Sequence, residues 1–405
     1  MFRRSFLKAV TAVTTCSKFP DQFQNTNYRN EIPCPNAFAI EEGFDYFNTG
    51  GLGPTLKSAT AKQLAVLEEI QPRVDRGHKL IVNARPEFAK FLGCSEQEIA
   101  YTRNATEGNS TIASGIKLNR GDEIIIDSHA HQGGSVAWMT RQLFDGVILK
   151  AFEPDSDSVQ GNLDRILQQI TPRTKVISVS HVTAPTGIRL PVNEIAKIAS
   201  DHNLWFHIDG AQSAGMLPLN LKNINCDSFA TCGHKWLCGP IGTGLLYVKL
   251  NRIDEIKPTE VGDYAAKDWK VPSELAIRKT AGRFESGTRD PASIIGLLEA
   301  IRYQKQVGSE KITSHSLSLA RYVRDELLSM PKVEVVSPIN KELDSAMISF
   351  RVEGLKFDRI FSQLWKQKFR CRPVSEQDIN AVRISTHYFN TLQQCNRLLD
   401  EIRKF

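Results

Sequence analysis

The chain has 405 residues, of which 41% are hydrophobic and 24% charged, and 51 basic against 45 acidic side chains give a net charge of +6. These ordinary values exclude a collagen-like, coiled-coil or mainly disordered chain, and a chain of this length is expected to bury a large core. The mild positive charge, without a basic run or an aromatic–basic stripe, does not indicate a nucleic-acid binder but leaves room for an acidic ligand.

The 8 cysteines are spread along the whole chain, and no two of them have CxxC spacing. A disulfide scaffold and a zinc knuckle both require closer, regular spacing. We therefore interpret most of these cysteines as reduced thiols in the core.

The N-terminus carries a segment, Arg3 to Lys8, that is similar to a twin-arginine export signal. Such a signal needs an apolar stretch of about 7–15 residues after the charges. Here that stretch, Ala9 to Thr15, is rich in threonine and ends at Cys16. Export to the periplasm and a cytoplasmic location both stay open, with the cytoplasm slightly favoured. No run approaches the ~20 apolar residues of a spanning helix, so we expect no membrane span.

Residues 1–40 are expected to be an irregular N-terminal segment, because prolines and asparagines recur in them. Residues 41–290 alternate between helical periods and short apolar runs. Helices are predicted over 55–70, 107–116, 135–143 and 192–202, and strands over 98–102, 123–126, 147–150, 176–180 and 204–208. This alternation predicts a large α/β domain with a mostly parallel sheet, in which ligands bind beyond the carboxyl ends of the strands.

The pattern changes after about residue 290. Helices are predicted over 294–306, 314–330, 357–365 and 392–402, and strands over 333–336, 346–350 and 382–385. Residues 291–405 are therefore expected to form a second, smaller α+β domain.

The strand predicted to end at Ile208 is followed by Asp209, two small residues and Gln212. A carboxylate at this position can face a cationic ring nitrogen, or it can cap the next helix. A second β-rich run ends at Gly233, and Lys235 follows in apolar and aromatic surroundings. Burial would lower the pKa of this lysine and make it a usable amine nucleophile, whereas an exposed loop lysine is the plainer alternative.

Asp209 and Lys235 are 26 residues apart, each at the end of a predicted strand. Together they form the pair that pyridoxal phosphate requires, a Schiff-base lysine and an acid that holds the pyridinium proton. The segments 207–212 and 233–240 resemble the class V aminotransferase family of pyridoxal-phosphate enzymes. This family includes cysteine desulfurases, selenocysteine lyases, kynureninases and isopenicillin N epimerase-like proteins. The resemblance runs from Tyr46 to Thr288 and resumes at 381–391.

The resemblance implies fold type I, with a mostly parallel seven-stranded-type sheet in the large domain and a smaller α+β C-terminal domain. It also implies a set of cofactor-binding residues, namely Ala105, Thr106, His131, Asp209, Gln212, His234, Lys235 and Thr288. In the family, Lys235 would be catalytic, His131 would stack on the cofactor ring and Gln212 would bind its phenolic oxygen.

Thr106 stands at a predicted helix start, where free N–H groups and the helix dipole favour a phosphate, although an ordinary cap is the alternative. His131 also forms a His-x-His pair with His129. On one strand both would face the same side, but no third ligand is evident, so we expect no metal site.

Thr288 lies in a segment similar to the loop by which the family's threonine reaches the phosphate of the neighbouring subunit, which would imply a homodimer. A polar turn is the alternative. Arg383, in 381–385, matches the arginine that clamps the substrate α-carboxylate, with a surface arginine on an edge strand as the alternative. Asn48, in the opening segment 46–54, is assigned to substrate binding by the same resemblance.

Several departures favour the isopenicillin N epimerase-like branch. Ala184 stands where desulfurases carry an asparagine, and the segments 46–54, 234–238 and 287–290 also look more like the epimerase-like branch. Cys232, a weak donor, stands where desulfurases usually carry a serine, so the resemblance does not carry the phosphate contact of that serine over to this chain. A desulfurase also needs a mobile cysteine, or an acid in its place, before the carboxylate-binding arginine. Only Cys371 is within reach, 12 residues before Arg383, and its flanking arginines could lower its pKa. A structural cysteine in an ordered strand is the favoured alternative.

The sequence thus predicts a pyridoxal-phosphate enzyme that acts at Cα of an amino acid or small peptide through an external aldimine, with epimerase- or aminotransferase-type chemistry. The alternatives are a cysteine desulfurase or selenocysteine lyase that uses Cys371, and a non-catalytic protein that binds pyridoxal phosphate. The substrate and the bond broken at Cα stay open.

Overall fold

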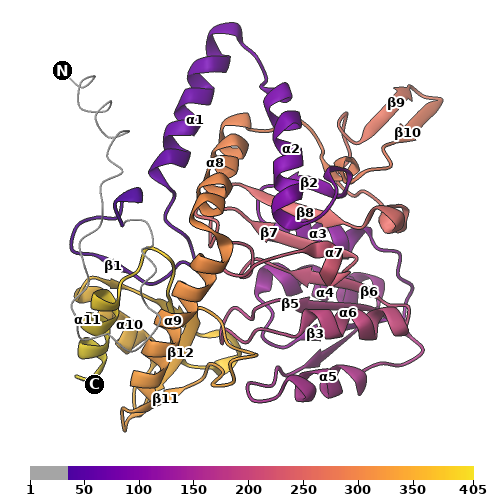
Figure 1. The fold of residues 1–405 in the computed structure, drawn as a ribbon. Coiled ribbons are helices and arrows are strands. Elements are labelled where there is room, and N and C mark those ends of the chain that lie inside the picture. The colour runs from indigo at the N-terminus through magenta and orange to yellow at the C-terminus, as the bar shows by residue number, and fades with distance from the viewer. Residues whose placement is uncertain (1–34) are drawn as a thin grey trace.

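The computed structural model describes residues 35–405 (Figure 1). The export-signal interpretation of Arg3 to Lys8 therefore lies outside the described residues. Within the described part, no helix is both long and apolar enough to cross a membrane.

A seven-stranded sheet forms the centre of the larger part of the molecule. Its strands, in spatial order, are β2 (Ile99–Thr102), β8 (Gly244–Val248), β7 (Ser228–Cys232), β6 (Trp205–Asp209), β5 (Thr174–Ser180), β3 (Glu123–Asp127) and β4 (Ile148–Phe152). All neighbours pair in parallel except β8, which is antiparallel to both β2 and β7. The predicted mostly parallel sheet is confirmed.

Helices cover both faces of this sheet. Successive residues of a strand point to opposite faces, and because apolar side chains occupy both, both faces have to be buried. Ile125, Ile177 and Phe206 belong to one core cluster and their chain neighbours Ile124, Val176 and Trp205 to another. The helices of this part are α1 (Lys57–Ile70), α2 (His78–Leu92), α3 (Ala105–Gly115), α4 (Gln132–Asp145), α5 (Val159–Leu167), α6 (Val192–Asp201), α7 (Leu221–Ile224) and α8 (Pro291–Val307). The first cluster takes side chains from α2, α6 and α8, and the second from α3 and α4.

Two of these helices begin earlier than predicted, because capping side chains precede them. The Asn104 side chain accepts a hydrogen bond from the Glu107 amide, so α3 begins at Ala105 rather than at Glu107. His131 caps α4 in the same way, through a hydrogen bond from the amide of Gly133. Thr106 is consequently the second residue of its helix and not the first.

The C-terminal part contains a four-stranded antiparallel sheet in the order β11 (Val333–Val335), β12 (Met347–Val352), β15 (Ala381–Ser385) and β14 (Arg372–Val374). Helices α9 (Ser309–Leu328), α10 (Phe357–Lys366) and α11 (Leu392–Ile402) pack against it around a separate core cluster. Strand β1 (Asp45–Tyr46), from the start of the chain, pairs with β13 (Phe369–Arg370) beside this sheet. The division into domains 41–290 and 291–405 stays a prediction, and two elements pack on the other side of it: α8 contributes to the core cluster of the large sheet, and β1 pairs with β13.

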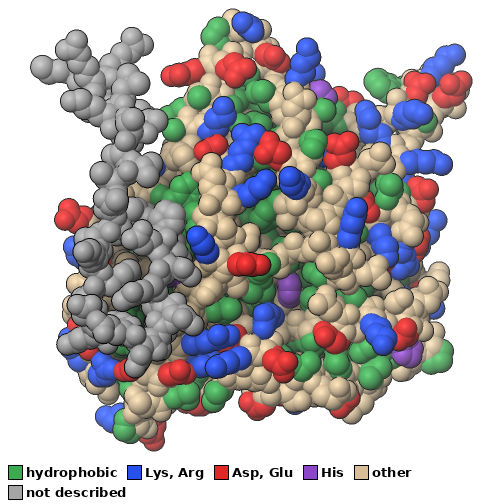
Figure 2. All heavy atoms as spheres, viewed as in Figure 1, with side chains coloured by type: hydrophobic (Ala, Val, Ile, Leu, Met, Phe, Trp, Pro, Cys, Tyr) green, Lys and Arg blue, Asp and Glu red, His purple; other side chains and the backbone are tan. Residues whose placement is uncertain are grey.

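The remaining regular elements are short. A hairpin of β9 (Ala266–Lys270) and β10 (Glu274–Ile277) projects from the body, at the upper right of Figure 1. Single 3-10 turns occur at Pro35–Ala37, Gln71–Arg73, Glu96–Glu98, Leu250–Glu255, Ala281–Phe284 and Glu376–Asp378. Figure 2 shows basic and acidic side chains interspersed over the visible face, as the mild net charge leads one to expect.

Candidate active site

A cavity of about 320 Å³ lies where parallel strands end and the C-terminal sheet approaches them. It brings together most of the predicted site residues, although they are spread over nearly the whole chain. Its lining includes Ala105, Thr106, His131, Asp209, Gln212, His234, Lys235 and Arg383. The position agrees with the rule that α/β sheets bind ligands beyond the carboxyl ends of their strands.

The first turn of α3 forms an anion site at one end of the cavity. Its opening amides, those of Ala105 and Thr106, have no acceptor within the helix, and the helix dipole adds partial positive charge there. Gly133 keeps this end open, because an added Cβ would lie 2.4 Å from the Thr106 hydroxyl oxygen. His234 also lines the cavity, and its Nδ1 is buried without a hydrogen-bond partner. These donors suit a phosphate group.

Asp209 ends β6, and its carboxylate is held from two sides. Oδ1 accepts a hydrogen bond of 3.0 Å from the Ala211 amide, and Oδ2 accepts one of 2.9 Å from Asn109 Nδ2. An added Cβ at Gly134 would lie 2.8 Å from Oδ2, so the glycine leaves room for the carboxylate. Asn109 was not among the residues predicted from the sequence. The sequence feature that could have indicated Asn109 is its position four residues after Ala105, because residues four apart lie on the same face of a helix.

His131 lines the cavity, and neither His131 nor His129 lies on a strand. Strand β3 ends at Asp127, and both histidines lie in the turn that follows. His129 Nδ1 is 3.0 Å from Thr186 Oγ1, while His131 Nδ1 accepts from the Gly133 amide, so the two rings have different partners. Burial, followed by the nearby Lys235, lowers the pKa of His131 and keeps its ring neutral. Among residues 35–405 no group of three or more His, Cys, Asp or Glu could hold a metal ion.

Lys235 lies in a tight loop directly after β7, and the opening segment of the chain packs on this loop. The Gly53 amide donates to the His234 carbonyl at 2.7 Å. An added Cβ at Gly53 would lie 1.9 Å from the Lys235 carbonyl oxygen, so only glycine allows this approach. The neighbouring Trp236 is fully buried and anchors the loop.

The amide of Gln212 has one orientation that its partners allow. Trp236 Nε1 can only donate and lies 2.8 Å from Oε1, while the Gly50 carbonyl can only accept and lies 2.8 Å from Nε2. The second N–H of Nε2 is left for a group in the cavity.

Arg383 is fully buried on β15, between β12 and β14, so it is not a surface arginine on an edge strand. Its Nη1 donates to the Ala184 carbonyl, whereas Nε and Nη2 are buried without partners. Burial, followed by Arg372, lowers the pKa of this guanidinium. Two unpaired donors on a buried cation are costly, and a bound carboxylate would satisfy both of them.

Cys371 does not belong to the cavity. It lies between β13 and β14, is 2% exposed and packs in the core of the C-terminal part. Burial raises the pKa of its thiol to about 12, so the expectation that the flanking arginines could lower it is wrong. One of those arginines, Arg372, does line the cavity and is paired with Glu376 at 3.3 Å between Nη1 and Oε2. The sequence analysis did not assign Arg372 to the site.

Two further predicted residues do not line the cavity of this chain. Thr288 is exposed, in the loop that precedes α8. Asn48 lies behind Gly51, which does line the cavity, and its Oδ1 is buried without a partner.

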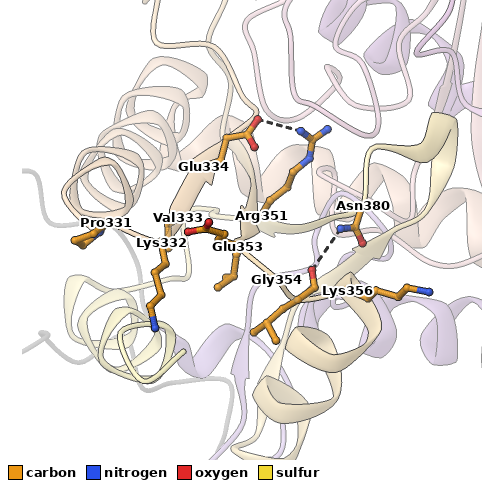
Figure 3. Close-up of a pocket in the computed structure, with 11 residues that line it drawn as sticks. Pro331, Lys332, Val333, Glu334, Arg351, Glu353, Gly354, Lys356 and Asn380 are labelled. Atoms are coloured by element: carbon orange, nitrogen blue, oxygen red, sulfur yellow. Dashed lines mark hydrogen bonds and ion pairs between the residues drawn. The ribbon is translucent and has the colours of Figure 1, made fainter.

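A larger hollow of about 580 Å³ lies elsewhere, beside β11 and β12 (Figure 3). Two of its charged side chains form an ion pair, in which Arg351 Nη1 lies 3.0 Å from Glu334 Oε1. None of the predicted site residues lines it. The smaller cavity is therefore the candidate active site.

The fold, with a lysine and a carboxylate after neighbouring strands of a mostly parallel sheet, is that of a fold type I pyridoxal-phosphate enzyme. The profile of the family described as Aminotransferase class-V matches residues 32–398. The chain belongs to this family, and the predicted fold class and cofactor are confirmed.

Named relatives carry two different activities. An isopenicillin N epimerase of Streptomyces clavuligerus is 28% identical over 375 residues, which cover 88% of this chain and 93% of the relative. A probable cysteine desulfurase of Halobacterium salinarum is 30% identical over 284 residues, 67% of this chain and 66% of the relative.

Solved structures agree on the fold. The apo cysteine desulfurase of Thermococcus onnurineus has a TM-score of 0.84 at 25% identity, covering 93% of this chain and 98% of that chain. A lysine-to-alanine mutant of C-DES, with glycine covalently linked to the pyridoxal-phosphate cofactor, has a TM-score of 0.85 at 25% identity, covering 92% and 100%. The family therefore includes both epimerases and desulfurases, and the reaction of this chain has to be argued from its own residues.

Proposed function

We propose that this enzyme acts at Cα of an amino acid or small peptide with a free α-amino group and a free α-carboxylate, in an epimerase- or aminotransferase-type reaction. The observation that carries the proposal is the buried Arg383, whose Nε and Nη2 have no partners, in one cavity with Lys235 and Asp209. An α-carboxylate would satisfy the arginine and bring the substrate amine toward the lysine.

The cofactor-binding roles follow from the same donors. The amides of Ala105 and Thr106, with His234, would hold the phosphate, and the free N–H of Gln212 would reach the phenolic oxygen. Asp209 would hold the proton at the ring nitrogen, and His131 would pack on the ring. When bound, pyridoxal phosphate supplies an electron sink for Cα.

Lys235 would move the proton at Cα as general base or acid. Arg383 would orient the carboxylate, and a bidentate clamp fixes the direction in which the Cα bonds point. Asn48 is proposed to contribute to substrate binding, which is supported by its unpartnered Oδ1 behind Gly51.

We further propose a homodimer in which Thr288 contacts the cofactor of the neighbouring subunit. Its exposure, and its absence from the cavity of its own chain, support this role. For the compartment we propose the cytoplasm, because the apolar stretch after Arg3 and Arg4 is short.

The burial of Cys371 argues against the desulfurase alternative. A sulfur-accepting cysteine has to reach the substrate as a thiolate, but this thiol is in the core and its pKa is about 12. Cys232 lines the cavity, yet burial raises the pKa of its thiol to about 11. The non-catalytic alternative leaves the two free donors of Arg383 without a purpose.

The test is a screen of amino acids and short peptides against the holoenzyme, read by changes in the cofactor absorption spectrum and by product analysis. We expect the product to be either the substrate with inverted configuration at Cα or the corresponding keto acid. We do not expect L-cysteine to yield sulfide and alanine. Lys235→Ala should lose the absorption band of the lysine-bound cofactor, whereas the exposed strand lysine variant Lys175→Ala should keep it. A spectrum that no substrate changes, or sulfide as the main product, would refute the proposal.

A further inference from the structure

We propose that Asn109 is a positioning residue for Asp209, and that it ends a one-directional chain of hydrogen bonds that begins at Trp205. The inference rests on the role proposed above for Asp209. It adds four side chains, from α3, β6 and β7, to the machinery that holds the carboxylate.

The chain is continuous and lies on the α3 side of the sheet. Trp205 Nε1 is 2.9 Å from Ser228 Oγ, and Ser228 Oγ is 2.8 Å from His207 Nδ1. His207 Nε2 is in turn 2.9 Å from Asn109 Oδ1, and Asn109 Nδ2 is 2.9 Å from Asp209 Oδ2. The four residues that precede Asp209 in this chain of hydrogen bonds are each at most 2% exposed, so water does not compete for these bonds. They are Trp205, Ser228, His207 and Asn109.

The direction of each bond follows from what each atom can do. Asn109 Nδ2 faces the Asp209 carboxylate and, at 3.2 Å, the Gly133 carbonyl, which can only accept. Asn109 Oδ1 therefore faces His207, whose Nε2 must carry the hydrogen.

The other end of the chain agrees with this direction. Burial lowers the pKa of His207 to about 4, so its ring is neutral and its Nδ1 has to accept from the Ser228 hydroxyl. Ser228 Oγ then accepts from Trp205 Nε1, which can only donate. Every member donates toward Asp209.

Such a chain has two consequences for the carboxylate. Bonds that point the same way polarise one another and strengthen the last one, which ends on a charge. The last bond of the chain, from Asn109 Nδ2, also holds the Asp209 carboxylate in one orientation for a cationic ring nitrogen. We expect loss of the chain to weaken cofactor binding and to move the pH at which the cofactor spectrum changes.

The sheet offers a matched control beside the chain. Ser178 on β5 lies next to His207 in register, and its hydroxyl accepts from Trp138 Nε1 at 2.9 Å. This pair repeats the Trp205–Ser228 pair, but no hydrogen bond joins it to Asp209. Ser178→Ala and Ser228→Ala each leave one buried tryptophan N–H without an acceptor, and Ser228→Ala in addition leaves His207 Nδ1 without a donor. Ser178→Ala therefore controls for the loss of the tryptophan contact, and thermal unfolding reports the remaining difference in stability.

The experiment measures the dissociation constant of pyridoxal phosphate and the pH midpoint of the cofactor absorption band, with thermal unfolding as a check of the fold. Asn109→Leu is expected to weaken cofactor binding by about tenfold to a hundredfold, since a hydrogen bond to a charge is lost. Ser228→Ala should shift the midpoint in the same direction by less. His207→Gln, whose amide can donate to Asn109, should stay closer to wild type than His207→Leu.

Asp209→Ala serves as the reference variant. If it keeps the wild-type affinity and midpoint, the role of Asp209 is wrong, and the inference falls with it. If Asp209→Ala loses both but Asn109→Leu does not, the positioning role alone is refuted. A shift with Ser178→Ala as large as that with Ser228→Ala would also overturn it, because the effect would then reflect general destabilisation.

Discussion

Arg372 and Arg383 lie directly opposite each other on the antiparallel strands β14 and β15, and both line the same cavity. They differ in their partners. Arg372 is paired with Glu376, whereas Arg383 keeps Nε and Nη2 unpaired. An anion that enters the cavity therefore meets one neutralised and one available guanidinium, and the available one should define the carboxylate position.

The first prediction concerns Arg383→Leu. We expect kcat/KM for the amino-acid substrate to fall by about tenfold to a hundredfold, because a bidentate charge-assisted contact is lost. The sharper measurement compares the substrate with the amine that lacks its carboxylate. The preference for the amino acid should collapse in Arg383→Leu and persist in Arg351→Leu, since Arg351 lies at the larger hollow instead. An unchanged preference would contradict the carboxylate role.

A second prediction separates Cys371 from catalysis. Cys371→Ser should keep turnover within about twofold of wild type, while burying a hydroxyl in the core should cost about 1–3 kcal/mol of unfolding free energy. Cys395→Ser is the matched control, because Cys395 is equally buried in the same core cluster. Product assays and urea unfolding measure the two effects. Loss of turnover in Cys371→Ser alone would restore the desulfurase alternative.

The third prediction is a loss of stability on acidification. Burial lowers the pKa of His181 and His387 to about 3 and that of His207 and His234 to about 4, from 6.5. Below pH 6.5 the unfolded chain therefore binds protons that the folded chain does not, so the unfolding free energy falls as the pH falls.

Asp127 opposes this trend. Burial raises its pKa from 3.8 to about 7, so the folded chain holds one proton that the unfolded chain releases. Near pH 5 the four histidines outweigh it by about three protons, or about 4.1 kcal/mol per pH unit. Asp127→Asn should make the dependence of unfolding free energy on pH steeper, because the difference in bound protons between the unfolded and folded chains grows by about one. Urea unfolding of the cofactor-free protein between pH 7 and 5 measures both slopes, and a flat profile would contradict the prediction.

The fourth prediction tests the shared active site. Lys235→Ala and Thr288→Asp chains should each be inactive as homodimers. Co-expressed, they should regain activity in the mixed dimer, because one site then combines an intact Lys235 with the intact Thr288 of the other chain. If Thr288 acted within its own chain, both sites of the mixed dimer would stay inactive. The measurements are activity and bound cofactor per mixed dimer purified with two different tags.

The central features of the site could be read from the sequence, because their signals are local. Asp209 and Lys235 each follow a short apolar run, and a residue directly after a parallel strand lies at the ligand-binding edge of a sheet. The alternation of helical periods and short apolar runs also placed strands β2 to β6 and helices α1, α3, α4 and α6, but it did not predict α2, α5 or β8. Element ends were less certain, since Asn104 and His131 extend their helices by side-chain caps that periodicity does not report.

Contacts between distant segments were decided only by the tertiary structure. Asn109 reaches Asp209 across 100 residues because α3 packs on β6, and Gly53 lies on the Lys235 loop because the opening segment returns to the sheet. Cys371 shows the same limit. Sequence analysis noted its flanking arginines, but packing buried the thiol and turned Arg372 toward the cavity. The net charge of +6 indicated room for an acidic ligand but not where it would bind. The fold decides this, because it buries the Arg383 guanidinium with Nε and Nη2 unpaired and so free to bind an anion.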